Sequence, residues 1–326
     1  MHGRLLRDIG LVGLAASGLS CARAARTVNQ GYMAVVSQLA PDRVRLDLDE
    51  GFVERYRNRV TITADFTVDA VSRTVNPNAF DGDLHFAGRA PTIGLRLVAE
   101  IKNADTEDSA QALVRAARTA GRPLLLTGAW RVWPEHALGA PETQGDSVPA
   151  LRNANPDHLF EIHPVTRIAG LGLLRSLHPV SGYRPGSPRS TLEEFTRARI
   201  SIQAGDGRIR LTLPTGLYND VHFILAPGRH GHRVVVDGRF LTGTAHDLDG
   251  NLLVEGLRIV LVRGSAAERA IRRLGPGGRA RVWALPRVSF AELSRIARTL
   301  PRDSTHAAPL PFELLILGVY PPDGVD

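Results

Sequence analysis

The order of predicted secondary-structure elements in the first half of the chain restricts the possible folds more than any other feature. Residues 57–71 alternate apolar and polar side chains, which predicts a long strand with one buried face. The full series is strands at 57–71, 83–87 and 93–101, a helix within 105–121, and strands at 123–130 and 158–168. A helix between the third and fourth of five strands is the order of an OB-fold, a small Greek-key barrel.

The helix has recognisable ends. Asp105 or Thr106 is the predicted N-cap, because a short polar side chain can accept a hydrogen bond from the first helical turn. Gly121 and Pro123 predict its end, since glycine readily adopts the left-handed conformation that follows a helix. The segment 134–157 is rich in proline, glycine and asparagine, so we expect a long loop there.

The second half of the chain repeats this pattern. Strands are predicted at 197–204, 207–213, 219–225 and between 232 and 262. Capping boxes beginning at Ser265 and Ser289 predict two further helices. Short echoes link the halves: "DGDLHF" with "YNDVHF" (218–223), "AGRPLLL" with "GGRARVW" (277–283), and "LFEIHP" with "PFELLI" (311–316).

We therefore expect a mainly β protein with a few helices, built as two tandem OB-like five-stranded barrels that arose by a diverged duplication. The linker is predicted where Gly, Pro and Ser dominate and no apolar period remains. The expected organisation is a signal peptide at 1–24, a first OB-like domain with the candidate site at 25–180, a linker at 181–195, and a degenerate second OB-like domain at 196–326.

The N-terminus has the pattern of a secretory signal. Arg4 and Arg7 precede an apolar run at 9–19 that is too short to span a bilayer, and small residues follow. The pattern predicts export to the periplasm, cell envelope or exterior, with cleavage near Ala24 and no transmembrane span. Cys21 is the sole cysteine, so no intrachain disulfide can form, and a lipid anchor on Cys21 is the alternative to plain cleavage.

The charge suits an anionic ligand without identifying one. The formal net charge is +7 and the pI is about 10.4. Lys102 is the only lysine, so the basic character comes from arginine, and no dense basic cluster is present. A solvated basic surface explains these facts equally well. The sequence contains no G-x-S-x-G, Walker A or Rossmann glycine pattern and no paired CxxC, which removes the usual support for serine-hydrolase and nucleotide chemistry.

Ionisable side chains gather at the strand ends of the first repeat. Residues two apart on a strand share a face, so Asp81, Asp83 and His85 project together, as do Glu161 and His163. Imidazoles and carboxylates are ligands for Zn²⁺ or Mn²⁺. We predict a divalent metal of this type, with ligands drawn from Asp81, Asp83, His85, His136 and His163.

Catalysis would follow from such an ion. A water activated by the metal could attack an ester or phosphodiester, with Glu161 or Glu100 as general base and Arg89 steadying an anion. The second repeat has "FELLI" where the first has "FEIHP", and only Asp220 and His222 are predicted to persist there. This asymmetry favours a function confined to the first barrel.

The motifs D-x-D-x-H-F, "VAEI", "TGAWRVWPEH" and "EIHPV" together resemble a group of uncharacterised exported bacterial proteins. The resemblance covers about residues 57–168, under half of the chain. It implies which residues matter, but no activity. The matching positions are Asp81, Asp83, His85, Ala99, Glu100, Gly128, His136, Glu161, His163 and Pro164.

Two other interpretations stay open. A non-catalytic module could bind an oligosaccharide, a nucleic acid or a protein through strands two and three of an OB barrel. Alternatively, the polar set could be a buried hydrogen-bond network that only stabilises the barrel. The three interpretations differ in one geometric respect: whether the imidazoles and carboxylates converge on one point.

Overall fold

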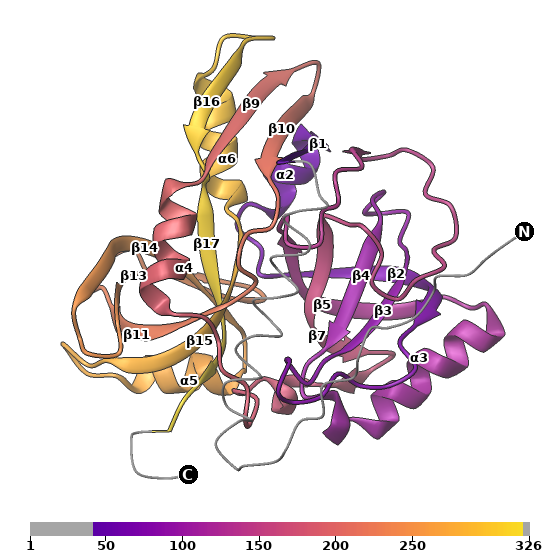
Figure 1. Ribbon diagram of the computed structural model, residues 1–326, viewed down its shortest axis with the longest axis horizontal. Helices are drawn as coiled ribbons and strands as arrows, with labels where there is room; N and C mark the ends of the chain where they lie inside the picture. The colour runs from indigo at the N-terminus through magenta and orange to yellow at the C-terminus, as the bar shows by residue number, and fades with distance from the viewer. Residues whose placement is uncertain (1–41, 322–326) are drawn as a thin grey trace, which may run out of the picture.

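The computed structural model describes residues 42–321, and the first barrel in it has the predicted strand order (Figure 1). Its strands are β2 (Thr61–Val71), β3 (Leu84–Arg89), β4 (Leu97–Ile101), β5 (Leu124–Val132) and β7 (Phe160–Ile168), with the two-residue β8 (Leu171–Gly172) beside β7. β2 pairs with β3 and β5, β3 with β4, and β7 with β5. A parallel pairing of β4 with β7 closes the barrel. The predicted signal peptide and Cys21 lie outside the described residues.

Alternation along β2 explains how this barrel is filled. Ile62, Ala64 and Phe66 are buried in the barrel core, while Thr63 and Asp65 between them are exposed. Because successive side chains of a strand point to opposite faces, the apolar period of the sequence becomes the inner surface of the barrel.

The second barrel repeats the strand connectivity of the first. Its strands are β11 (Val221–Pro227), β13 (Gly238–His246), β14 (Leu252–Val262), β15 (Ala280–Val288) and β17 (Phe312–Val319), with β12 (Arg233–Val235) at the edge of β13. β11 pairs with β13 and β15, and a parallel pairing of β14 with β17 again closes the sheet. Helix α5 (Ala266–Arg273) lies between the third and fourth strands, as α3 (Asp108–Ala120) does in the first barrel. The two tandem barrels are therefore confirmed, and their common origin stays a prediction.

One of the three echoes joined strands that are not equivalent. "DGDLHF" leads into β3, the second strand of its barrel, whereas "YNDVHF" leads into β11, the first strand of the other. The correspondence of Asp220 and His222 with the first-barrel motif is therefore wrong. The other two echoes fall on the fourth and fifth strands of both barrels, as expected for equivalent elements.

A third sheet, which the sequence pattern did not predict, joins the two halves of the chain. Its order is β16-β9-β10-β1-β6, and it stands above the two barrels in Figure 1. The strands are β1 (Arg43–Asp49), β6 (Glu142–Thr143), β9 (Arg199–Gly205), β10 (Arg208–Pro214) and β16 (Thr305–Pro309). β1 pairs antiparallel with β10, so the sheet crosses the expected domain boundary at 195–196. Helices α2 (Glu50–Tyr56) and α6 (Phe290–Thr299) meet beside it, where the Ser294 hydroxyl hydrogen-bonds Glu54.

Two local expectations need correction. A short 3₁₀ turn, η1 (Ala104–Thr106), takes the residues predicted to cap α3, and the helix begins at Asp108 after Glu107. The Thr106 hydroxyl instead donates to the Asn103 carbonyl, while Gly121 ends the helix in the left-handed conformation as predicted.

The expected linker at 181–195 contains most of a helix, α4 (Pro188–Arg197). Proline favours the first helical turn, and Thr191, Leu192 and Phe195 form a buried stripe at helical spacing. A second 3₁₀ turn, η2 (Leu174–Ser176), precedes this segment. Among residues 42–321, no helix combines the length and apolar character needed to cross a membrane.

Candidate metal centre

The predicted site residues gather on the outer wall of the first barrel. Along β7, Phe160, Ile162 and Val165 point into the barrel core, so Glu161 and His163 point outward. Glu100 on β4 and His85 on β3 are paired opposite each other in the ladder, on the same outer wall. Because β4 lies between β3 and β7, side chains from the second and fifth strands meet there.

Asp83, Glu100 and His163 form the centre of this group. Nε2 of His163 lies 3.3 Å from Oδ2 of Asp83, and its Nδ1 lies 3.2 Å from Oε2 of Glu100. All three side chains are at most 3% exposed. Each offers a ligand atom within 4.8 Å of the other two, so the set can hold a metal ion.

Polar atoms of this group lack hydrogen bonds although they are buried. Both ring nitrogens of His163 and Oδ1 of Asp83 have no hydrogen-bond partner among the described residues. A buried polar atom without a partner is costly and rare in folded proteins. Donor atoms left open at one point are the arrangement that a bound cation would satisfy.

Glu161 extends the group toward the loop that follows β5. Its Oε2 accepts a hydrogen bond from Nη1 of Arg131 at 2.7 Å, and its Oε1 lies 3.1 Å from Nε2 of His158. In the loop, Oε1 of Glu135 lies 3.5 Å from Nε2 of His136. Glu135, His136 and Glu161 form a second set whose ligand atoms lie within 4.8 Å of one another.

Three further side chains, Lys102, Asp81 and His85, surround the centre. Nζ of Lys102 lies 2.9 Å from Oδ2 of Asp83 and also donates to the Asp81 carbonyl at 3.1 Å. The Asp81 carboxylate accepts from the backbone N–H of Asp83 and from the Asn76 amide, so it orders the turn before β3. His85 reaches the edge of the group, with Nε2 3.4 Å from Oε1 of Glu100.

Burial and the close spacing of acids and bases shift the pKa values of several side chains in this group. Burial lowers the pKa of His163, but the carboxylates of Glu100 and Asp83 outweigh it and raise that pKa to about 10. For Asp83, burial is outweighed by Lys102 and His163, and the pKa is lowered. Burial dominates at Glu135, whose pKa is raised well above the usual range, and at His136, whose pKa is lowered well below it.

The second barrel covers this wall. Trp283 of β15 lies under the ammonium group of Lys102, with Nζ 4.2 Å from the ring centroid. Nε of Arg131 donates to the Pro286 carbonyl at 2.8 Å. His85 on β3 and Glu100 on β4, whose side chains point outward from the barrel, are buried. This part of the strand-two and strand-three face is therefore not open to an OB-type ligand, whereas Arg89 at the end of β3 is 39% exposed.

The structure sorts the predicted residues into three places. Asp83, Glu100 and His163 meet, with His85 and Asp81 adjoining them. His136 and Glu161 belong to the second set, so His136 does not share a ligand group with His163 as we had expected. Arg89 is paired with Asp69 on β2, through Nε and Nη2 at 2.9 and 2.8 Å, rather than with the cluster.

Sequence reasoning missed two contributors to the site, Lys102 and Arg131. A signal for Lys102 was present, because a single lysine in an arginine-rich chain stands out. Arg131 gave none, since its role depends on the register of β5 against β7, which pairs it with Glu161.

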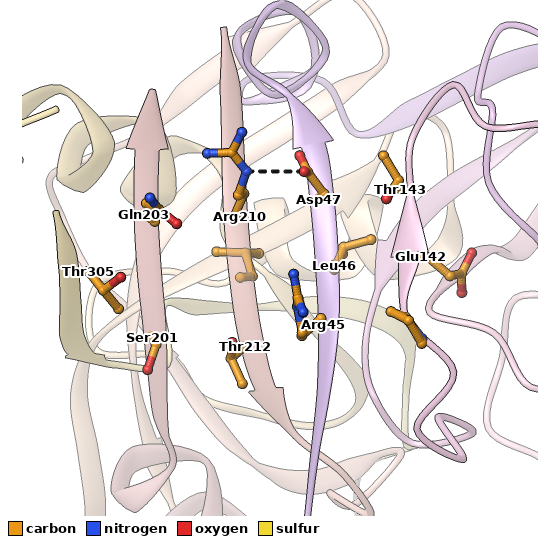
Figure 2. A pocket seen from close by; sticks show the side chains of 12 residues that line it. Arg45, Leu46, Asp47, Glu142, Thr143, Ser201, Gln203, Arg210, Thr212 and Thr305 are labelled. Carbon is orange, nitrogen blue, oxygen red and sulfur yellow. Dashed lines mark hydrogen bonds and ion pairs between the residues drawn. The ribbon is translucent and has the colours of Figure 1, made fainter. Parts of the chain in front are cut away.

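A separate hollow of about 230 Å³ lies on the third sheet and shares no residue with the cluster. Figure 2 shows its lining side chains on β1, β9, β10 and the neighbouring strands, with Arg210 bridged to Asp47. That ion pair measures 3.3 Å, and Arg208 approaches the same carboxylate at 2.7 Å. The lining contains no histidine or cysteine, so the hollow has fewer candidate metal ligands and nucleophiles than the buried cluster.

No protein-family model matches the chain, and no curated protein is similar to it.

Proposed function

We propose that the protein binds a divalent metal ion of the zinc or manganese type through Asp83, Glu100 and His163, and uses it to hydrolyse a phosphoester or similar bond. The observation that carries the proposal is the convergence of one buried imidazole and two buried carboxylates, whose ligand atoms lie within 4.8 Å of one another. Three protein ligands, with coordination positions left for water and substrate, are typical of catalytic sites.

The chain's own residues would divide the remaining work. A bound ion supplies Lewis acidity and lowers the pKa of water. Glu161 sits next to His163, with Oε2 3.5 Å from Nδ1, and could take a proton as general base. Arg131, held by Glu161, supplies the permanent positive charge that we had assigned to Arg89. Lys102 keeps Asp83 in place through one oxygen and leaves the other available.

Metal content tests the first half of this proposal. The full chain should purify with, or take up, stoichiometric zinc or manganese, and His85→Ala combined with His163→Ala should lose it. His246→Ala is a matched control, because His246 is a buried histidine of the second barrel. Equal, substoichiometric metal in all three proteins would overturn the proposal.

Hydrolysis needs its own assay. A chromogenic phosphodiester and a chromogenic carboxylic ester should be compared with the metal-loaded chain, the chelated chain and Glu161→Gln. Turnover that requires the metal and falls by about 10²–10⁴-fold in Glu161→Gln fits a general base. Metal binding without turnover of either ester would support a metal-binding protein and contradict the proposed hydrolysis.

Export is part of the proposal and depends only on the N-terminal pattern. Arg4, Arg7 and the apolar run 9–19 support it. The mass of the mature N-terminus decides between cleavage near Ala24 and a lipid-modified Cys21. An intact N-terminus on the secreted or envelope-associated protein would contradict both.

A further inference from the structure

We infer that the centre takes a second divalent cation, held by Glu135, His136 and Glu161, next to the first ion. This inference rests on the proposed function for the first ion. The second set has the same spacing as the first, with one ligand atom from each residue within 4.8 Å of the others. The second set is drawn from two elements: Glu161 lies on β7, and the other two residues lie in the loop after β5.

The two oxygens of Glu161 face different partners. Oε2 lies 3.5 Å from Nδ1 of His163, a ligand of the first set. Oε1 lies 3.1 Å from Nε2 of His158, whose ring stacks on the ring of His136 with centroids 5.2 Å apart. Glu161 therefore lies between the two donor sets, which would place the two ions close together, as in two-metal sites, where the ions lie about 3.5–4 Å apart.

An independent observation comes from Glu135. This side chain is 7% exposed, and its Oε2 has no hydrogen-bond partner among the described residues. The nearest cation is Nη1 of Arg131 at 3.5 Å, which is committed to Glu161 by a hydrogen bond of 2.7 Å. Oε2 of Glu135 is therefore a buried carboxylate oxygen without a hydrogen-bond donor, next to the imidazole of His136, and it is placed to bind a metal ion.

Acidic side chains outnumber the permanent cations in this region. Six carboxylates lie in or beside the two sets, and Lys102 and Arg131 are the permanently charged bases that contact them. Buried charges are stable only when they are compensated. The six acids are Asp81, Asp83, Glu100, Glu135, Glu161 and Asp220.

A pair of ions also narrows the substrate class. Two adjacent divalent cations stabilise both the attacking and the leaving oxygen of an in-line displacement at phosphorus. A negatively charged phosphoester therefore fits this centre better than a neutral carboxylic ester.

Metal stoichiometry and manganese EPR of the full chain test the inference. The wild type should bind two equivalents of Zn²⁺, and its Mn²⁺ form should give the spectrum of a coupled pair. Glu135→Gln combined with His136→Ala should bind one equivalent and give an uncoupled Mn²⁺ signal. Asp83→Asn combined with His163→Ala should lose the first ion.

The outcomes separate the two claims. One equivalent in the wild type, lost in the Asp83/His163 variant and unchanged in the Glu135/His136 variant, overturns the second ion and keeps the proposed function. One equivalent with the opposite sensitivity overturns the proposed first site and keeps the second. No bound metal in the wild type overturns both. Circular dichroism and the melting temperature, with His246→Ala as control, establish that each variant is folded.

Discussion

The two barrels share one architecture and one buried ion pair, yet their outer walls differ in chemistry. Arg131 of β5 pairs with Glu161 of β7, and Arg287 of β15 pairs with Glu313 of β17, at the same ladder position in each barrel. The arginines also reach across the interface in reciprocal fashion. Arg131 donates to the Pro286 carbonyl, and Nη1 of Arg287 donates to the Trp130 carbonyl at 2.9 Å.

Strand pairing identifies the counterparts of the candidate ligands. Ala99 pairs with Ile162 in the first barrel, as Ile259 pairs with Leu314 in the second. Moving one residue along each strand places Val260 and Leu315 where the first barrel has Glu100 and His163. Phe240, which pairs with Val260, takes the place of His85, and two residues before it Gly238 takes the place of Asp83.

The comparison shows that a barrel of this architecture can form without the polar cluster, because the second barrel lacks it. In the second barrel the equivalent wall is an apolar cluster that includes Phe240, Val260 and Leu315, packed against Val60 and Ala129 of the first barrel. The Arg–Glu pairs are therefore common to both barrels, whereas the histidines and the remaining acids of the cluster belong to the first barrel alone.

The largest expected effect concerns the shared pair. Glu313→Gln should lower the free energy of unfolding by about 3–5 kcal/mol, because Arg287 and Arg258 would then lack a buried carboxylate. Glu161→Gln should cost less, since Arg131 retains Glu135 at 3.5 Å. Urea denaturation of both variants measures the difference, and equal costs would contradict it.

Metal should stabilise the protein through one barrel alone. At a free metal concentration 100 times the dissociation constant, the wild type should gain about 2.7 kcal/mol per ion, which a chelator removes. Asp83→Asn combined with His163→Ala should lose the gain that comes from the first ion. Thermal unfolding with and without metal is the measurement, and a full gain in that variant would refute the site formed by Asp83, Glu100 and His163.

Giving the first barrel the apolar wall of the second should exchange function for stability. Asp83→Ala, Glu100→Val, Lys102→Val and His163→Leu together remove two acids and two bases. Replacing a buried ionic group by packed apolar side chains often stabilises a protein by about 1–4 kcal/mol. We expect a chain that cannot hold the first ion and that, after chelation, has a higher melting temperature than the chelated wild type. A lower one would show that the cluster is mainly a stabilising network.

The smallest effect is a pH dependence confined to the second barrel. Burial, helped by Arg281, lowers the pKa of His222 to about 4. The folded state therefore favours neutral His222, so its stability is full above pH 6.5 and is lost as the pH falls toward 4. The loss should be about 1 kcal/mol between pH 7 and pH 5, since the ring is partly exposed. His222→Gln should flatten this part of the unfolding profile, and an unchanged profile would contradict the assignment.

Local patterns predicted the elements of the fold better than their boundaries. The alternation in 57–71 and the capping boxes at Ser265 and Ser289 are present, and both serine side chains cap their helices. The cap of α3 was misplaced because Glu107, which precedes the helix, is held by Arg175 at 2.7 and 2.8 Å. That contact joins residues 68 apart, so no local window contains it.

The candidate site was predicted in part for the same reason. Asp83, His85, Glu161 and His163 share faces because residues two apart on a strand do so, which the sequence alone reveals. The division into two ligand sets depends on the course of the loop after β5, which carries Glu135 and His136. Loop conformation is set by contacts rather than by periodicity, so His136 was grouped with His163.

The sequence by itself determined the order of strands and helices and which side chains share a strand face, because these follow from neighbours only a few residues apart. Only the tertiary structure decided that the polar wall of one barrel is buried against the apolar wall of the other. It also decided that Glu100 meets His163 and that Arg131 is locked to Glu161. These contacts depend on barrel closure, strand register and the packing of one barrel on the other, and such long-range pairings leave no local pattern in a chain.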